Sequence, residues 1–193
     1  MNTTESINRS GTSCNKHNLS ELTLEELWQL FPIILTEYNP VWKDWYNKEA
    51  LTLKELLPEN VIIHHVGSTA IEGIWAKPIV DILIEAELAD FPVIHELLLA
   101  NGYRNMYTKE QRRGYNKGYT EQGFAEKVFH LHLRTFGDHD ELYFRDYLNA
   151  HSDAAKQYEE LKLSLWKKYE HDRDGYTAAK EEFVKKYTIK NDM

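Results

Sequence analysis

Two short apolar segments joined through a small-residue turn constrain the fold of this chain more than any other feature. Residues 61–65 open with Val, Ile and Ile, and residues 79–86 are apolar at all but two positions. Short continuous apolar runs of this kind are typical of buried strands. Residues 67–69 (Gly-Ser-Thr) follow the first run, and glycine lets backbone N–H groups approach an anion closely because it has no Cβ. The pattern predicts a sheet with an anion-binding turn at the end of one strand.

Asp81 lies inside the second apolar segment, near its start. An unpaired carboxylate among apolar neighbours is unfavourable unless a cation or hydrogen bonds meet it, and carboxylate oxygens suit divalent cations. Lys77 lies between the turn and Asp81 and could contact a phosphate as a point charge. The turn, Lys77 and Asp81 together indicate a site for nucleotide phosphates. The alternative interpretations are an ordinary tight turn at residues 67–69, a cap or structural salt bridge formed by Asp81, and a solvated Lys77.

Composition limits the classes of protein to which the chain can belong. Its 193 residues, 42% of them hydrophobic, suffice for one domain with a helical appendage. A net charge of −8 argues against non-specific attraction to nucleic acid or to an anionic membrane, and no apolar run approaches the roughly 20 residues that span a bilayer. The lone cysteine, Cys14, suits a reducing compartment. We therefore expect a cytoplasmic protein whose partner is a small-molecule nucleotide, not a membrane or a nucleic acid.

The remaining pattern predicts a mixture of strands and helices. Residues 1–18 are rich in Asn, Ser and Thr and are expected to form a disordered lead-in. Thr23 and Glu26 have the spacing of a helix capping box. The expected elements are strands at residues 33–35, 61–65, 79–86, 103–107 and 128–135, helices at 41–57 and 90–100, a polar connection at 108–122, and two amphipathic tail helices whose aromatic residues pack in the core.

Several short motifs are shared, in the same order, with one known family. They are residues 65–70 (HVGSTA), 77–81 (KPIVD), 130–132 (HLH) and 144–148 (FRDYL), followed by the tail residues Tyr158, Lys162, Tyr176, Lys180 and Phe183. Over residues 33–187 the chain therefore resembles the GrpB family of the nucleotidyltransferase superfamily. The resemblance implies an α+β fold, in which a nucleotidyltransferase-like mixed β-sheet is flanked by helices and carries a C-terminal helical pair. We expect the core at residues 19–140 and the helical extension at residues 141–193.

The resemblance also implies roles for residues around the turn. In the superfamily the Gly-Ser turn binds the triphosphate and acidic residues bind the metal. We therefore expect Gly67 and Ser68, with the adjoining Thr69, to contact phosphate. Asp81 matches the first catalytic aspartate. Superfamily enzymes usually carry a second acidic residue two positions later, and this chain has Leu83 there. The expected pair of metal-binding carboxylates is therefore incomplete.

Three further side chains are candidates to complete a metal site. Glu85 shares a strand face with Asp81 but lies about 7 Å along the strand, from a rise of roughly 3.3 Å per residue; an exposed strand-end carboxylate is the alternative. His130 and His132 alternate on the strand where the superfamily places its third carboxylate. They could present ring nitrogens to a metal or a phosphate, or simply bond within the sheet. A site of Asp81, His130 and His132 would favour Zn²⁺ or Mn²⁺ over Mg²⁺.

The sequence thus supports two main hypotheses about function. In the first, the protein binds a nucleoside triphosphate with a divalent metal (Mg²⁺ or Mn²⁺, or else Zn²⁺) and, as a transferase, moves a nucleoside monophosphate to an acceptor that the sequence does not identify. Asp81 would then bind the metal, and His132 would act as a ligand or a general base. In the second, the loss of a carboxylate at Leu83 leaves a non-catalytic module that binds a nucleotide or a protein. Hydrolysis of a phosphoester through the histidine pair is a third hypothesis.

Overall fold

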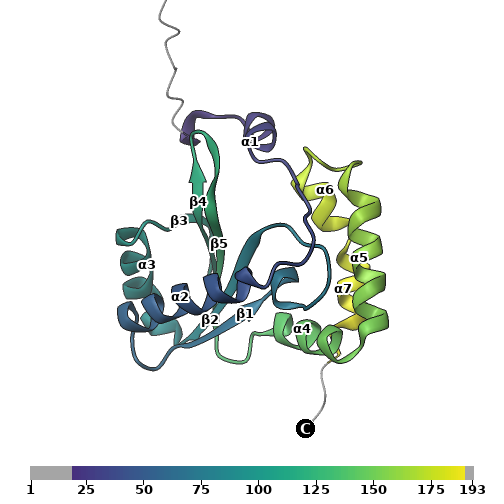
Figure 1. Cartoon of the computed structure of the whole chain (residues 1–193). Coiled ribbons are helices and arrows are strands. Elements are labelled where there is room, and N and C mark those ends of the chain that lie inside the picture. The colour runs from purple at the N-terminus through teal and green to yellow at the C-terminus, as the bar shows by residue number, and fades with distance from the viewer. Residues whose placement is uncertain (1–18, 190–193) are drawn as a thin grey trace, which may run out of the picture.

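The computed structural model describes residues 19–189, which form a central β-sheet with helices around it (Figure 1). The lead-in predicted for residues 1–18 lies outside the described residues. The strands are β1 (Ile62–Val66), β2 (Ile79–Ala86), β3 (Arg104–Lys109), β4 (Arg112–Thr120) and β5 (Gly123–Thr135). The helices are α1 (Leu24–Leu30), α2 (Val41–Leu56), α3 (Phe91–Ala100), α4 (Asp140–Ala150), α5 (Ser152–Trp166), α6 (Arg173–Ala178) and α7 (Glu181–Tyr187). No helix within residues 19–189 is both long and apolar enough to span a bilayer.

The strands form one mixed sheet in the order β1-β2-β5-β4-β3. Strands β2 and β5 run parallel, and every other neighbouring pair is antiparallel. The register places Asp81 of β2 opposite His130 of β5. It also places Asn116 of β4 opposite His130, and Arg104 of β3 opposite Asn116. Because residues directly opposite one another share a face, these four side chains form one row across the sheet. The predicted α+β class with a mixed sheet is confirmed.

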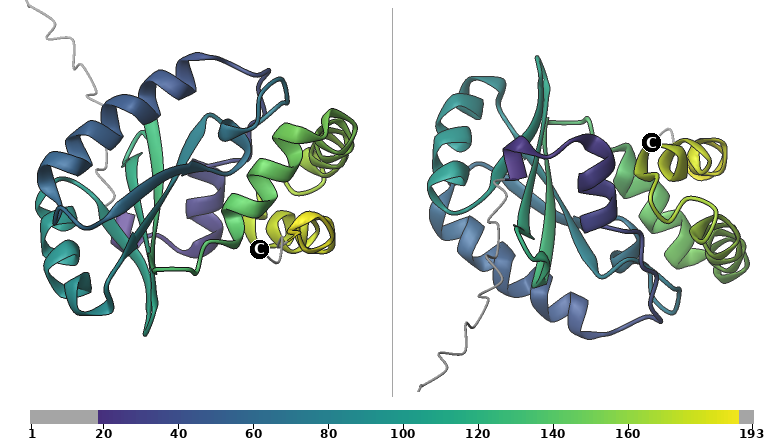
Figure 2. Two further views of the ribbon diagram at one scale, coloured as in Figure 1. Left: turned by 90° about the horizontal axis from the view of Figure 1, so that it is seen from below. Right: turned by 90° about the horizontal axis from the view of Figure 1, so that it is seen from above.

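The two faces of the sheet differ in character. On β2, Val80, Ile82 and Ile84 point to one face, where they are fully buried against α2 and α3. The helices contribute to this core through Trp42, Leu53, Phe91, Ile94 and Leu98. Alternate residues of a strand point to opposite faces, so Asp81 belongs to the second face, on the side of α1 and the tail helices (Figure 2).

The tail helices α4–α7 pack beside this second face (Figures 1 and 2). A second apolar cluster joins α4 and α5 to the segment that follows the turn, through Ile71, Ile74, Phe144, Leu148 and Tyr158. A third cluster brings Ile33 and Leu35 against Tyr176 of α6. The indole of Trp166 donates a hydrogen bond of 2.5 Å to the Ile33 carbonyl. The N-terminal segment and the tail are thus joined next to the sheet.

Two segments differ from what the sequence predicts. Residues 33–35 form no strand, and Ile33 and Leu35 are held by apolar packing instead of a sheet ladder. Residues 108–122, expected to be a polar connection, lie largely in β4. The polar composition is misleading here because β4 gives the core few apolar side chains. Tyr115 is buried with α3, whereas Arg113 and Lys117 lie over the rings of Phe91 and Tyr103.

Other elements agree with the sequence. Thr23 and Glu26 form the predicted capping box at the start of α1, and α2 and β2 occupy almost the predicted residues. The tail, expected to be a helical pair, consists of four helices between Asp140 and Tyr187, because α4 precedes α5 and the second amphipathic stripe is interrupted between α6 and α7.

Candidate functional site

The turn between β1 and β2 brings the backbone against Asp81. Strand β1 ends at Val66, whose partner on β2 is Asp81 itself. Gly67 follows with φ +72°, in the left-handed region that favours glycine, and a Cβ built there would lie 2.9 Å from Asp81 Cγ. Ser68 then starts the short 3₁₀ turn η2 (Ser68–Ala70). The missing side chain at Gly67 therefore lets the Asp81 carboxylate lie directly against the turn.

Two histidines of β5 meet the Asp81 carboxylate. His132 Nε2 donates to Asp81 Oδ1 at 3.2 Å, and His130 Nδ1 lies 3.4 Å from the same oxygen. The carboxylate stays accessible, with 25% of its side-chain surface exposed. Burial raises the pKa of Asp81, but the hydrogen bonds from the two histidines outweigh burial and hold the pKa below its ordinary value. Asp81 is therefore an anion at neutral pH.

His130 links Asp81 to Tyr119. The Tyr119 hydroxyl donates to His130 Nε2 at 2.7 Å, and Arg173 Nη2 lies 3.4 Å from the same nitrogen. Burial lowers the pKa of His130 to about 4, so its ring is neutral at pH 7. A neutral imidazole carries a single N–H, which places the proton on Nδ1, facing Asp81. The protein thus engages both ring nitrogens of His130.

Asp81 opens into a cleft of about 910 Å³ that collects positive charge. Besides the turn and the histidines, its walls include Lys77, Lys162, Lys180 and Arg173. Burial lowers the pKa of Lys77 and Lys162 to about 7 and that of Lys180 to about 8, and neighbouring cations add to the effect. Within residues 19–189, no carboxylate lies within ion-pair distance of these lysines. The walls also carry Asp140, Glu141 and Glu181, so the distinctive feature of the cleft is three lysines that lack an ion-pair partner in the described part of the chain.

Aromatic rings hold the lysines in place. Lys180 Nζ lies 4.2 Å and Lys77 Nζ 5.7 Å from the centre of the Tyr176 ring. Lys162 Nζ lies 4.8 Å from the centre of the Tyr158 ring and donates to a backbone carbonyl. Contacts of a cation with the face of a ring are attractive but leave the charge unneutralised. The positive charge is therefore available to an anionic ligand.

The sequence assigned a phosphate contact to Lys77, whereas Lys162 and Lys180 were identified only as tail residues shared with the family. Lys162 belongs to α5, Arg173 to α6, and Lys180 to the residues between α6 and α7. Their helices carry aromatic residues, and the tail was therefore predicted to be core packing. One signal was available, because Lys162 falls among the apolar positions of its helix. The side chain is only 1% exposed, and lysines are almost never fully buried unless they are paired.

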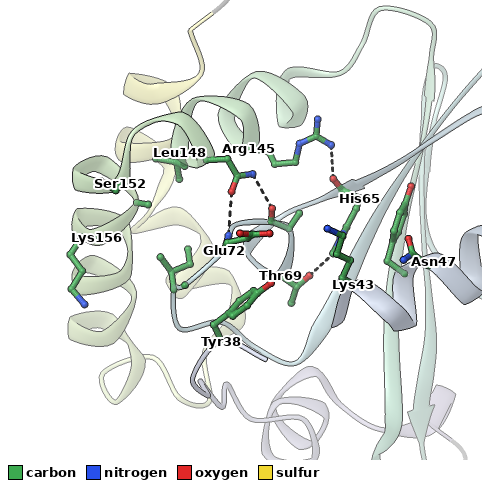
Figure 3. Close-up of a pocket in the computed structure, with 16 residues that line it drawn as sticks. Tyr38, Lys43, Asn47, His65, Thr69, Glu72, Arg145, Leu148, Ser152 and Lys156 are labelled. Carbon is green, nitrogen blue, oxygen red and sulfur yellow. Dashed lines mark hydrogen bonds between the residues drawn. The ribbon is translucent and has the colours of Figure 1, made fainter. Parts of the chain in front are cut away.

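Thr69, expected to contact phosphate, lies outside the cleft. It is 4% exposed, and its hydroxyl donates to the Ile79 carbonyl at 3.3 Å and accepts from His65 Nε2 at 3.0 Å. Thr69 and His65 face a separate cavity of about 720 Å³ between α2, α4 and α5, which we call the Thr69 cavity (Figure 3). Arg145 of α4 lines it and donates to the His65 carbonyl at 2.8 Å. The turn thus presents Ser68 to the cleft and Thr69 to the other cavity.

Glu85, another candidate metal ligand, belongs to a different cluster. Its carboxylate accepts hydrogen bonds from His64 Nε2 at 2.9 Å, from His139 Nδ1 at 2.8 Å and from the Gly137 N–H at 2.8 Å. Burial raises the pKa of Glu85, but these bonds outweigh burial and lower it. Glu85 therefore fastens the segment after β5 to β1 and β2, and the structure does not bring it to Asp81.

The geometry does not fit a resident metal centre. Among residues 19–189, no three His, Cys, Asp or Glu side chains are arranged to hold one ion. His130 is engaged at both ring nitrogens, and Leu83, where the family resemblance led us to expect a second carboxylate, is fully buried. The predicted set of Asp81, Glu85, His130 and His132 is therefore not a single cluster. Asp81, His130 and His132 line the cleft, and His130 is the least exposed of the three.

Comparison with known proteins relates this arrangement to one family. Residues 32–190 match the family model described as GrpB protein. A glutamate-rich protein GrpB of Alkalihalophilus pseudofirmus is 38% identical over 160 residues, which cover 79% of this chain and 91% of that protein. The UPF0157 protein YqkA of Bacillus subtilis is 33% identical over 171 residues, which cover 84% of this chain and 49% of YqkA. The chain thus spans about half the length of that second relative.

A solved structure shares the fold. The crystal structure of GrpB from Enterococcus faecalis matches with a TM-score of 0.65 at 28% sequence identity, and the match covers 81% of this chain and 100% of the other. The family match includes all five strands, the Gly67 turn and the lysines of the tail.

Proposed function

The chain belongs to the GrpB family, and from that premise we propose that it binds a nucleoside triphosphate in the cleft beside Asp81. One observation carries the proposal. Three largely buried lysines, none of them with a carboxylate partner within residues 19–189, gather around the Gly67 turn. Burying cations without partners is unfavourable, and an anionic ligand relieves this. A ligand with several negative charges is therefore the best match for the cleft.

The cleft suits a chain of phosphates. The turn at Gly67 offers backbone N–H groups and the Ser68 hydroxyl to one phosphate. Lys77 and Lys180 share the Tyr176 ring, so the charges that face the ligand come from both the sheet and the tail. A triphosphate carries its negative charges along a line and can contact both groups at once. Its binding would raise the pKa of these lysines towards the ordinary value.

The same arrangement supports transfer of a nucleoside monophosphate. An acceptor hydroxyl would attack the α-phosphorus, the bond between that atom and the bridging oxygen to the β-phosphorus would break, and pyrophosphate would leave. His132 donates its Nε2 proton to Asp81, and its Nδ1, which has no hydrogen-bond partner among residues 19–189, would take the proton of the acceptor. Because the described residues do not fit a resident metal centre, a divalent ion would enter with the substrate as a metal–triphosphate complex.

A non-catalytic nucleotide-binding module is the second candidate, and Leu83 favours it. This fully buried side chain occupies the position of the second carboxylate. Transfer of this kind depends mainly on neutralising the charge that develops on the phosphates, and Asp81 alone gives a metal ion only one carboxylate. In that case the cleft would bind the triphosphate and release it unchanged.

Two measurements separate the candidates. Titration calorimetry with ATP, CTP, GTP and UTP, in the presence of Mg²⁺ or Mn²⁺, tests binding. Release of pyrophosphate, with a small-molecule extract as the source of acceptors, tests transfer. Binding without pyrophosphate release, and without any effect of Asp81→Asn on affinity, would support the module. If no triphosphate binds, both candidates fail.

Lys77→Met provides the matched test of the phosphate site. It should weaken triphosphate binding at least about tenfold, because a hydrogen bond to a charged group contributes roughly 1.5–3 kcal/mol. Lys54→Met, at an exposed position of α2, makes the same chemical change away from the cleft and should leave binding unaltered. Equal losses in the two variants would show only a general effect of charge.

A further inference from the structure

We propose that a cavity next to the cleft receives the base of the bound nucleotide, and that Asn116 recognises an exocyclic amino group on this base. The inference rests on the proposed function, since it concerns the nucleoside part of the same ligand. The cavity, which we call the aromatic cavity, has a volume of about 820 Å³. Its walls include Trp28, Phe31, Asn116, Tyr119 and Phe124.

The aromatic cavity adjoins the cleft. Lys77, Ile79 and Arg173 line both of them. A ligand whose phosphates contact Lys77 can therefore extend past Arg173 into the aromatic cavity. By contrast, the Thr69 cavity and the cleft share no lining residue within the described part of the chain. Of the two neighbouring cavities, only the aromatic cavity is continuous with the proposed phosphate site.

The row of side chains across the sheet leads from one cavity to the other. Asp81 and His130 line the cleft, and their neighbours in the row, Asn116 and Arg104, line the aromatic cavity. Tyr119 lines the aromatic cavity and donates to His130 at 2.7 Å, which joins the two sites by a hydrogen bond. A nucleotide lying along this row would have its phosphates at the Asp81 end and its base at the Asn116 end.

The wall of the aromatic cavity suits a flat heterocycle. The Phe31 ring centre lies 4.7 Å from that of Tyr119 and 5.1 Å from that of Phe124. Trp28 adds a fourth ring from α1. Bases stack on aromatic side chains whatever their identity, because every base has a π-face. The rings therefore explain affinity for a base but not a choice between bases.

Asn116 is the residue that can distinguish one base from another. Its Oδ1 is buried and has no hydrogen-bond partner among residues 19–189. Asn105 also lines the cavity, but its amide already donates to the carbonyls of Tyr107 and Gly114, at 3.3 and 3.4 Å. A buried acceptor without a partner is unfavourable until a donor reaches it. The amino group of adenine or cytosine is such a donor, and the adjacent ring nitrogen can accept from the amide nitrogen of Asn116.

The test compares three ligands that each contain a chain of three phosphates. ATP, inosine triphosphate (with a carbonyl in place of the amino group) and inorganic tripolyphosphate are titrated against the full chain. We expect ATP to bind about tenfold more tightly than either of the others. In Asn116→Leu, ATP and inosine triphosphate should bind alike, with the affinity for tripolyphosphate unchanged. Asn60→Leu, at an exposed asparagine that donates to Asp90, should keep the preference for ATP.

The outcomes distinguish this inference from the proposed function. Equal affinities for ATP and tripolyphosphate would overturn the base site and leave the phosphate site intact. If neither ligand binds, the proposed function itself fails and the inference falls with it. A preference for ATP that survives in Asn116→Leu would overturn the role of Asn116. The thermal midpoint of Asn116→Leu should not fall, because the Oδ1 atom that it removes has no partner among residues 19–189. The comparison of ATP with inosine triphosphate also tests the inference in the unmodified chain.

Discussion

The site depends on one residue that has no side chain. The Asp81 carboxylate occupies the space that a Cβ at Gly67 would need, and Gly67 has φ +72°. Gly73, a few residues later, has the similar φ of +76°, but nothing lies within 4 Å of its Cβ position. Substituting each glycine in turn therefore distinguishes the effect of backbone strain from that of a steric conflict with the Asp81 carboxylate.

Gly67→Ala should abolish triphosphate binding, whereas Gly73→Ala should leave it unchanged. Both variants should lose roughly 1–2 kcal/mol of unfolding free energy, because a left-handed backbone disfavours residues with a Cβ. Only the first also displaces Asp81. Urea denaturation measures the stability of the two variants, and calorimetry measures their binding. Normal binding by Gly67→Ala would mean that the close contact between carboxylate and turn is not needed.

The residues that meet at the turn were predictable because local sequence brings them together. Gly67, Ser68 and Asp81 lie on two paired strands and the turn after the first of them, so backbone pairing alone fixes their proximity. Thr69 was placed in the same group because it is adjacent in sequence, but it faces a different cavity. Glu85 is held by histidines from β1 and from the segment before α4. The alternation of residues along β2 shows which face Glu85 is on, but not which residues of other segments it contacts there.

Among the elements, α1 has an unusual position as one wall of the aromatic cavity. Leu24, Leu27 and Trp28 line that cavity, and no residue of the helix is fully buried. The helix is short, and helices of this length are marginal without tertiary packing. Its start is fixed by the capping box, in which Thr23 N–H donates to the Glu26 carboxylate at 2.8 Å and Glu26 N–H donates to the Thr23 hydroxyl at 3.3 Å.

Thr23→Ala should loosen α1 without affecting the phosphate site. Loss of an N-cap side chain costs about 1 kcal/mol, so amide hydrogen exchange within α1 should accelerate. ATP should bind more weakly, and tripolyphosphate equally well. Thr52→Ala is the control, since Thr52 is an exposed residue of α2 whose hydroxyl, among residues 19–189, bonds only to the Lys48 carbonyl at 3.2 Å. Alanine favours helices. Unchanged exchange in α1 would show that other contacts hold it.

In the tail, the sequence predicts the helices but not which of their side chains face the cleft. Amphipathic spacing indicated helices in this region, and α5 to α7 lie there. The same spacing could not show that Lys162 and Lys180 face a cleft, because that depends on how the tail packs on a sheet formed by residues far earlier in the chain. Strand β4 carries little apolar pattern because Tyr115 is the residue that it contributes to the main core.

In the molecule as a whole, the N-terminal segment, the sheet and the tail are packed together. The Ile33 N–H donates to the Glu170 carbonyl at 2.8 Å, and the Trp75 N–H donates to the Glu159 carboxylate at 3.0 Å. The residues after 140, predicted to be a helical extension packed on the core, thus bond to the N-terminal segment and to the residues before β2. The cleft lies at the interface of this extension with the rest of the molecule, and its charges come from both sides of it.

The lysines of the cleft should make the stability of the molecule depend on pH. Their pKa values are lowered from 10.5 to about 7 for Lys77 and Lys162 and to about 8 for Lys180. Between pH 7 and pH 9 the unfolded chain therefore binds more protons than the folded one, so the free energy of unfolding rises with pH. Urea denaturation should show a gain of at least about 1 kcal/mol over this range.

Two comparisons check the origin of this gain. Lys77→Met should reduce it, because one of the titrating groups is removed. Saturating ATP should reduce it as well, since bound phosphate returns the lysine pKa values towards the ordinary range. A stability that falls between pH 7 and pH 9 would contradict the assignment.

The cations of the cleft come late in the chain. Lys162, Arg173 and Lys180 follow all five strands in sequence, whereas Gly67 and Asp81 precede the last three. On the ribosome, the sheet and its carboxylate emerge before most of the positive charge that surrounds them. A chain translated only to that stage has Gly67, Lys77 and Asp81 but lacks the walls of the cleft that α5 to α7 supply. The proposed triphosphate site would therefore be complete only in chains whose translation has passed Lys180, and binding there would stabilise finished chains rather than folding intermediates.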